Sequence, residues 1–547
     1  MPLERKTPGV YITEIDAFPK AGDPVTGVAT AVPVFIGYTE FAGVPHSGQP
    51  LYNTPVPVAS LAEFRQSFGG SAAALFAVEA LPQPGTDTKA IRVSPRANPA
   101  GPDRFCLARQ IELFYANGGG NCVVVSVGSY WADQQPVSVP DAIPDTWQTE
   151  TIAAEALLTG LTAAEHTTGI TMIVVPEACQ LPSDGYGKVV QAMLTQASAL
   201  QDRMAIFDLP GCLSATTLAD VQCGQTGLAD AMAPVLDKAS YGAAYAPALR
   251  TTIAREPDLD IAAFRAPDGD NGTLNGLLTA EALQFYEGAE RTQVQQAIAA
   301  AFPCPGPATN SATLSNDPAG YPALADATAW RATLDNLLSI TLPTYAEVKA
   351  QALALLNIAP PSGGVAGVWS ANDANRGVWA APANIALASV SAPLCDIDND
   401  AQPAFNLPIN GEAINIIRSM PSRGTVIWGA RTLDGNSLDY RYINVRRTLI
   451  YIEQSVKLAL QAFVFERNDA ATWTAVTASV SSFLTGLWQA GGLVGAKPAD
   501  AFKVACGLGT TMTGEDILNS YMRAAVTVAV THPAEFIELT FTQTMAG

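Results

Sequence analysis

The feature that most constrains this fold is an alternation, between residues 113 and 238, of short apolar runs with segments of helical pattern. The runs "NCVVVSVG", "GITMIVVPE" and "MAIFDLP" have the continuous apolar character of strands that are buried on both faces. The segments "AAEALLTGLTAAEH" and "GKVVQAMLTQASALQDR" between them predict helices. Since strands that alternate with helices form βαβ units, the sequence predicts an α/β fold with a largely parallel sheet.

The last third of the chain is also regular. It contains a strand signal, "TVIWGARTL", a helix over 442–465, a second helix that Asp469 caps and a Gly491-Gly492 pair ends, and the strand "AAVTVAV". In the first helix one face is apolar, and Glu453 and Lys457 lie on the opposite face. The apolar face consists of Val445, Leu449, Ile452, Val456, Leu460 and Phe463. We expect this face to form a core.

Both ends of the chain have the pattern of a strand. Residues 7–15, "TPGVYITEI", are rich in β-branched and aromatic residues, and "DAFPKAGDPVTG" after them is a loose connection. Residues 533–547, "PAEFIELTFTQTMAG", alternate apolar and polar side chains after the proline. Two pairings are open from this pattern: the two ends join each other or a sheet of their own chain, or they pair with another molecule.

Composition narrows the class of protein. Of 547 residues, 48% are hydrophobic but only 15% are charged, and the chain has 44 glycines and 39 prolines. A low fraction of charged residues is expected if partners cover most of the surface. It is also expected of an acidic protein with many uncharged polar surface residues. The net charge of −20 argues against binding of nucleic acid through phosphates. From residue 366 onward there are 12 basic and 15 acidic residues, so the acidity belongs to the first two thirds.

The start of the chain has no apolar core of a signal peptide, and no run of 18 apolar residues predicts a membrane span. We therefore expect no direct membrane insertion. The eight cysteines are scattered and form no CxxC pair. We expect them to be free thiols in a reducing cytoplasm. They are Cys106, Cys122, Cys179, Cys212, Cys223, Cys304, Cys395 and Cys506.

The chain offers little to a catalytic mechanism. Its three histidines (His46, His166 and His532) lie in settings that favour structural or solvent roles. Serine nucleophile elbows and Walker loops do not occur, and "GGLVGAKPAD" has the wrong spacing for a phosphate loop. Residues 268–276, "DGDNGTLNG", lack the glutamate that would complete a calcium loop. We expect no catalytic site, cofactor or metal. The alternative is an α/β enzyme with an active site near Asp208 or Cys212, which follow or end a predicted strand.

Several segments resemble those of contractile tail sheath proteins. "TPGVYITEI", "FYANGGGNCVVVSV", "MAIFDLP" and "SYGAAYAPAL" occur in the family's order, and the stronger likeness begins at Pro360. It consists of "APPSGGVAGVWSANDANRGVWAAPAN", "GEAINIIRSMPSRGTVIWGARTL", "YRYINVRRTLIYIEQSV", "FVFERND", "FLTGLW" and "HPAEFIELTFTQ". An aromatic motif of the family is reduced here to "AYAPA" at 244–248.

This resemblance implies a structural subunit that forms stacked hexameric rings around an inner tube and contracts to drive the tube through a membrane. It implies an N-terminal arm (1–24), an outer α/β domain (25–254), a loop-rich insertion (255–365), an inner domain (366–534) and a C-terminal arm (535–547). The implied partners are other copies, the inner tube protein, and baseplate and terminal cap proteins. The implied setting is the bacterial cytoplasm, within a phage tail or a phage tail-like particle that can be released.

In such sheaths the terminal arms add strands to sheets of neighbouring subunits. The residues that this implies for the intersubunit β-arms are Val10, Tyr11, Ile12, Thr13, Ile15, Phe536, Ile537, Leu539 and Phe541.

Overall fold

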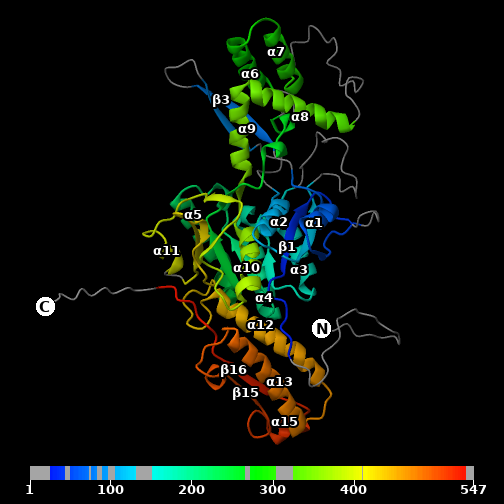
Figure 1. The fold of residues 1–547 in the computed structure, drawn as a ribbon, viewed down its shortest axis with the longest axis vertical. Coiled ribbons are helices and arrows are strands. Elements are labelled where there is room, and N and C mark those ends of the chain that lie inside the picture. The colour runs from blue at the N-terminus through cyan, green and yellow to red at the C-terminus, as the bar shows by residue number, and fades with distance from the viewer. Residues whose placement is uncertain are drawn as a thin grey trace, which may run out of the picture. The chain divides into compact units, whose positions relative to one another are not determined.

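The structure is a computed structural model, and it describes residues 25–43, 50–72, 75–82, 89–95, 105–130, 151–264, 271–303, 324–408 and 411–536. The chain forms two compact units (Figure 1). We call Thr30–Arg446 the central unit, and Met1–Ala29 with Arg447–Gly547 the terminal unit.

The central unit is built on a nine-stranded sheet of order β11-β14-β13-β8-β7-β6-β1-β5-β2. Its six middle strands, from β13 to β5, are parallel, whereas β2, β14 and β11 join antiparallel at the two edges. In the order of the sheet, the strands are Ile385–Ala386, Gly424–Ile427, Ile414–Met420, Gly242–Ala246, Met204–Asp208, Met172–Val174, Pro33–Thr39, Cys122–Ser129 and Val56–Val58. The predicted α/β class is confirmed, and the three predicted apolar runs are β5, β6 and β7.

Helices cover both faces of this sheet. The Phe35 ring lies 5.2 Å from the Phe114 ring of α2, whereas the next residue, Ile36, faces Gly160 of α3. Successive side chains of a strand point to opposite faces, so α2 and α3 cover opposite faces. The helices of this part are α1 (Leu61–Phe68), α2 (Leu107–Ala116), α3 (Ala154–Glu165), α4 (Ser183–Leu200), α5 (Leu218–Met232), α10 (Ser362–Arg376) and α11 (Pro403–Asn406).

The glycines of "PSGGVAGVWS" serve the packing of α10 against α2. A Cβ atom on Gly367 would lie 2.4 Å from the Phe114 carbonyl oxygen, and one on Gly363 would lie 2.6 Å from the Gln110 carbonyl oxygen. A backbone oxygen cannot move aside as a flexible side chain can, so the two helices can approach this closely only where α10 has glycine.

A second core in the central unit joins four helices and a hairpin, which we call the head. The helices are α6 (Gly272–Phe285), α7 (Gly288–Ala301), α8 (Leu324–Thr341) and α9 (Pro343–Leu356), and the hairpin is β3 (Phe76–Pro82) with β4 (Lys89–Pro95). The amide of Gln351 on α9 accepts a hydrogen bond from the Val93 N–H and donates one to the Ile91 carbonyl oxygen. The sequence predicted an irregular insertion at 255–365. The head is largely helical, and it includes a hairpin from the first hundred residues.

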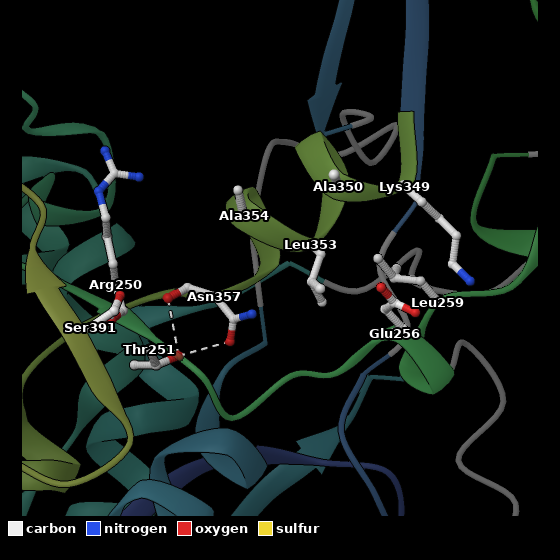
Figure 2. Close-up of a pocket in the computed structure, with 10 residues that line it drawn as sticks. All are labelled: Arg250, Thr251, Glu256, Leu259, Lys349, Ala350, Leu353, Ala354, Asn357 and Ser391. Atoms are coloured by element: carbon white, nitrogen blue, oxygen red, sulfur yellow. Dashed lines mark hydrogen bonds between the residues drawn. The ribbon is translucent and has the colours of Figure 1, made fainter. Parts of the chain in front are cut away.

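Asn357 holds together the two chain segments that connect the head to the sheet (Figure 2). Its side-chain oxygen accepts a hydrogen bond from the Thr251 hydroxyl at 3.0 Å, as Figure 2 shows. The same oxygen accepts one from the Ala254 N–H at 3.0 Å, and the amide nitrogen donates to the Ala254 carbonyl oxygen at 2.9 Å. Beside it lies a cleft of about 330 Å³, lined by residues that include Arg250, Glu256 and Lys349. Residues of a three-stranded sheet line this cleft. In that sheet β9 (Leu249–Thr251) lies between β10 (Ile358–Ala359) and β12 (Val390–Pro393).

The terminal unit contains the two helices predicted in the last third, and α12 (Ile443–Leu460) contributes residues to both units. On the predicted apolar face, Val445 and Ile452 of α12 and Phe463, which follows α12, are buried, and the other three residues are half-buried. The remaining elements are α13 (Ala470–Gln489), α14 (Pro498–Ala501), β15 (Phe502–Cys506), α15 (Gly514–Leu518) and β16 (Ala524–Val528). Among the described residues, no helix is long and apolar enough to cross a membrane.

The predicted borders between an outer domain, an insertion and an inner domain stay a prediction. The compact units follow other borders, because residues 366–446 group with the central unit and only the residues from Arg447 onward form the terminal unit with the N-terminal segment.

Replacing Asn357 by alanine should destabilise the central unit. The buried Ala254 would lose partners for both its N–H and its carbonyl group, and each unsatisfied buried polar group costs about 1–3 kcal/mol. We expect a lower urea midpoint for Asn357→Ala. The matched control is Asn375→Ala, which removes an exposed amide that makes one hydrogen bond within α10. Equal midpoints for the two variants would contradict the role assigned to Asn357.

Replacing Ile452 by aspartate should leave the protein unfolded or insoluble, because the variant buries an unpaired charge at a cost of several kcal/mol. Leu449→Asp should have a smaller effect, since Leu449 is only half-buried. The control is Leu458→Asp on the exposed side of the same helix. Thermal melting and the soluble yield are the measurements, and normal melting of Ile452→Asp would show that this face is not a core.

Candidate intersubunit site

The terminal unit displays a two-stranded sheet whose strands have no other strand partner in the described part of the chain. β15 and β16 pair antiparallel, from Phe502 opposite Val528 to Cys506 opposite Ala524. Every residue of the two strands is half-buried or exposed. Two strands alone are marginally stable in water, and an edge strand presents N–H and carbonyl groups to any chain that can pair with them. This pair is the candidate site for an added strand.

The helix α13 supports this sheet. It packs on β15 and buries Val476, Val480, Leu484 and Leu487 along one face. The Asp469 carboxylate accepts hydrogen bonds from the Ala471 and Thr472 N–H groups at 3.1 Å, as predicted for a cap. These bonds lower the pKa of the Asp469 carboxyl. The sheet therefore rests on a well-formed helix although its own strands are short.

The first and last described residues of the chain both lie in the terminal unit. The Val28 N–H donates to the Ser455 hydroxyl on α12, and a side chain at Gly27 would collide with the Tyr451 hydroxyl. At the other end, the Val494 N–H donates to the Ala529 carbonyl oxygen and the Thr531 N–H to the Gly492 carbonyl oxygen, which fixes the chain beyond β16 against the end of α13. The first and the last described stretches of the chain are therefore both held by hydrogen bonds within the terminal unit.

Of the predicted arm residues, only Phe536 lies within the described residues, and its side chain is 70% exposed. Val10, Tyr11, Ile12, Thr13, Ile15, Ile537, Leu539 and Phe541 lie outside them. Their pairing stays a prediction. Sequence reasoning identified the strand "AAVTVAV", which is β16, but missed β15. Its signal is the alternation in "FKVAC" of the half-buried Phe502 and Val504 with the exposed Lys503.

At the alternative active site, the Asp208 side chain has a structural role. Asp208 ends β7 and is buried, and its two carboxylate oxygens accept hydrogen bonds from the backbone N–H and the hydroxyl of Ser362, at 2.9 and 2.6 Å. The neighbouring Gly363 N–H donates to the Gln110 side chain. Asp208 therefore caps the start of α10, and the Cys212 thiol beside it is also buried.

Glu177 plays the same part for α2. The fully buried carboxylate accepts hydrogen bonds from the N–H groups of Tyr38, Cys106 and Leu107, between 2.9 and 3.3 Å. Ligands of open α/β sheets bind outside the carboxyl ends of the strands. Here Glu177, which follows β6, and Asp208, which ends β7, instead accept hydrogen bonds from the first residues of α2 and α10.

The other candidates have structural settings or lie outside the description. His166 ends α3 and is exposed, His532 is exposed, and His46 is not described. Of the calcium-like loop, residues 271–276 are described: Asn271 donates to the Pro303 carbonyl oxygen, and residues 272–276 begin α6. Among the described residues no group of three or more potential metal ligands occurs. The described cysteines are free, and Cys304 lies outside the description, so the thiol state of the whole chain stays a prediction.

The sequence profile of the phage tail sheath C-terminal domain matches residues 436–544. This range contains α12, α13 and the β15–β16 pair. This part of the chain is therefore similar to the C-terminal domain of phage tail sheath proteins. No protein in a search of curated proteins matches the chain.

Solved structures with the same fold are sheath and baseplate assemblies. The anti-feeding prophage (AFP) baseplate in its contracted state is 21% identical over 99% of this chain and 98% of that one, with a TM-score of 0.55. The AFP helical sheath in its contracted state is 22% identical over 98% and 99%, with a TM-score of 0.54. The PVC sheath complex of an extracellular contractile injection system, also contracted, is 22% identical over 98% of each chain, with a TM-score of 0.52. At these identities the likeness establishes the fold.

Asp208 should make the central unit less stable as the pH rises. Burial raises the pKa of its carboxyl to about 7, although the two hydrogen bonds from Ser362 lower it. A carboxyl whose pKa is higher in the folded than in the unfolded state contributes stability below its ordinary pKa of about 4 and loses it as the pH rises through 7. At about 1.4 kcal/mol per pKa unit, the change is a few kcal/mol.

We therefore expect urea midpoints of the wild-type protein to fall between pH 5 and 8, and those of Asp208→Asn to fall less steeply. The control is Asp220→Asn, because Asp220 is an exposed cap whose hydrogen bonds with Thr217 lower its pKa. That variant should keep the wild-type slope over this range. Parallel pH profiles for wild type and Asp208→Asn would show that Asp208 does not titrate there.

Proposed function

We propose that this chain is the structural, non-enzymatic subunit of a contractile sheath. It polymerises as stacked hexameric rings around an inner tube, and the polymer contracts to drive the tube through a target membrane. The family match and the sheath fold over almost the whole chain support this role. Other partners are the baseplate and the terminal cap. The chain is made and assembled in the bacterial cytoplasm, within a phage tail or a phage tail-like particle.

The observation that carries the proposal is the unpartnered β15–β16 pair. Each subunit offers this pair as an acceptor and gives its terminal arms as donors, so that neighbours are joined by shared sheets. The donor residues are Val10, Tyr11, Ile12, Thr13 and Ile15 at one end, and Phe536, Ile537, Leu539 and Phe541 at the other. Because donor and acceptor are different surfaces, the contact is heterologous and can continue as a helix.

Charge supports the same arrangement. The residues from 366 onward carry a net charge of only −3, since 12 basic residues face 15 acidic ones. The remainder of the chain carries the other 17 negative charges, because the total is −20. Weak net charge suits close packing of many identical copies in an inner layer, while the acidic part suits an outer, solvated layer.

Contraction needs no nucleotide in this account. The sheath is assembled in an extended, strained arrangement, and its subunits rotate as rigid bodies into a shorter, wider helix. The glycine- and proline-rich connection "DAFPKAGDPVTG" tethers the N-terminal strand and lets neighbours stay joined during the rotation.

Removing residues 534–547 should leave a folded, soluble protein that cannot form a sheath. In this proposal the backbone hydrogen bonds of the terminal strand, about 0.5–1.5 kcal/mol each, stabilise the polymer. The measurements are thermal melting and negative-stain electron microscopy of polymers. Leu539→Pro should act in the same way, since proline removes a strand donor. Deletion of residues 1–16 should also weaken assembly.

The competing arrangement places the tail in a sheet of its own chain. In that case truncation should lower the melting temperature by many degrees and cause aggregation. That result, or normal polymers from the truncated chain, would reject the exchanged strand.

A further inference from the structure

Two adjoining loops of the terminal unit expose four large apolar side chains. Val464 and Phe465 follow the end of α12 and are 61% and 103% exposed, and Leu518, the last residue of α15, and Tyr521, between α15 and β16, are 86% and 57% exposed. We call residues 464–469 and 518–523 the paired loops. Exposed apolar groups that gather on one part of a folded protein mark surfaces for protein contact.

The backbone at these side chains is held in a costly conformation. Phe465 has φ of +71° and Ser520 has φ of +62°, in the left-handed region that residues with a Cβ atom rarely adopt. An aromatic residue is strained in this conformation, and glycine would avoid the strain. Because the Phe465 side chain is fully exposed, no side-chain contact with the described residues repays this strain.

The paired loops are nevertheless joined to each other by a hydrogen bond, and each is held by further contacts of its own. The Asn468 amide donates a hydrogen bond to the Tyr521 carbonyl oxygen at 3.0 Å, and its side-chain oxygen accepts one from the Trp473 indole at 2.7 Å. The Arg523 guanidinium pairs with Asp516 and lies 5.3 Å from the centre of the Tyr521 ring. The exposed side chains are therefore presented by a preformed surface, which lowers the entropy cost of binding.

We propose that the paired loops bind the apolar side chains of the C-terminal segment of a second copy of this chain. The inference rests on the proposed function, because it adds a side-chain contact to the exchanged strand. In an extended segment Ile537, Leu539 and Phe541, which lie beyond the described residues, share one apolar side, while the exposed Phe536 lies on the other. Tyr521 lies three residues before β16, so the paired loops continue directly from the strand that would accept the segment.

The position at which the segment begins favours a second copy over the same chain. Asn468 and Tyr521 lie at the start of α13, whereas Thr531 is bonded to Gly492 just beyond its end. The 20 residues of α13 separate these points by about 30 Å. The chain also runs from the paired loops through β16 toward Gly492. Its own C-terminal segment would therefore have to turn back and run the length of α13 to reach the paired loops.

The test is Phe465→Gly in the full-length protein. Removal of the strained aromatic residue should leave the melting temperature of unpolymerised protein unchanged or raised. It should raise the protein concentration needed for polymer formation at least tenfold, as measured by sedimentation and electron microscopy. The control is Leu438→Gly, which removes a side chain that is 78% exposed in the central unit and should leave polymer formation unchanged.

If truncation of 534–547 abolishes polymers while Phe465→Gly forms them at the wild-type concentration, the paired loops are not the binding surface and the exchanged strand stands. If truncation leaves polymers intact, the proposed function fails instead.

A cross-link identifies the occupant. The photoreactive residue p-benzoylphenylalanine in place of Phe465 should join peptides 533–547 of another copy, as mass spectrometry of mixed light and heavy subunits can show. Cross-links confined to one chain, or to a tube protein, would overturn the proposal.

Discussion

Backbone hydrogen bonding at the edges of β15 and β16 is the constraint on which this account depends. A buried or paired strand satisfies its N–H and carbonyl groups through neighbours. In the described part of the chain these two strands have only each other. Stable isolated hairpins are uncommon in water, and here the hairpin is carried by α13 and flanked by loops that expose apolar side chains. The terminal unit therefore has a surface that another strand would complete.

In the central unit, by contrast, buried polar side chains satisfy the backbone groups around them. Glu177 and Asp208 stand where open α/β sheets commonly bind ligands, yet both are buried and accept hydrogen bonds from the first N–H groups of a helix. Asn357 likewise satisfies the backbone of Ala254 at the base of the head. These groups make a rigid body from distant segments of the chain. Such a body, joined to the unit with the unpaired strand edges, suits the polymer subunit that we propose.

Much of this architecture could be predicted from local sequence. The continuous apolar runs predicted β5, β6 and β7, which are buried on both faces. The spacing of apolar residues predicted α12 and α13, and Asp469 predicted where α13 begins. Other features depend on contacts between distant residues. The head takes its hairpin from residues 76–95, far from its helices, and β15 is short, with an alternation that covers only five residues. No local pattern reveals that Asp208 meets Ser362, or that Phe465 has a positive φ.

Hydrogen exchange of the amides in β15 and β16, before and after polymerisation, tests the central claim most directly. If arms of other subunits pair with these strands, their amides should exchange at least tenfold more slowly in the polymer, whereas the amides of β6 and β7 should be protected equally in both states. Unchanged exchange in β15 and β16 on polymerisation would contradict the account, because the strand edges would then remain unpaired in the assembled sheath.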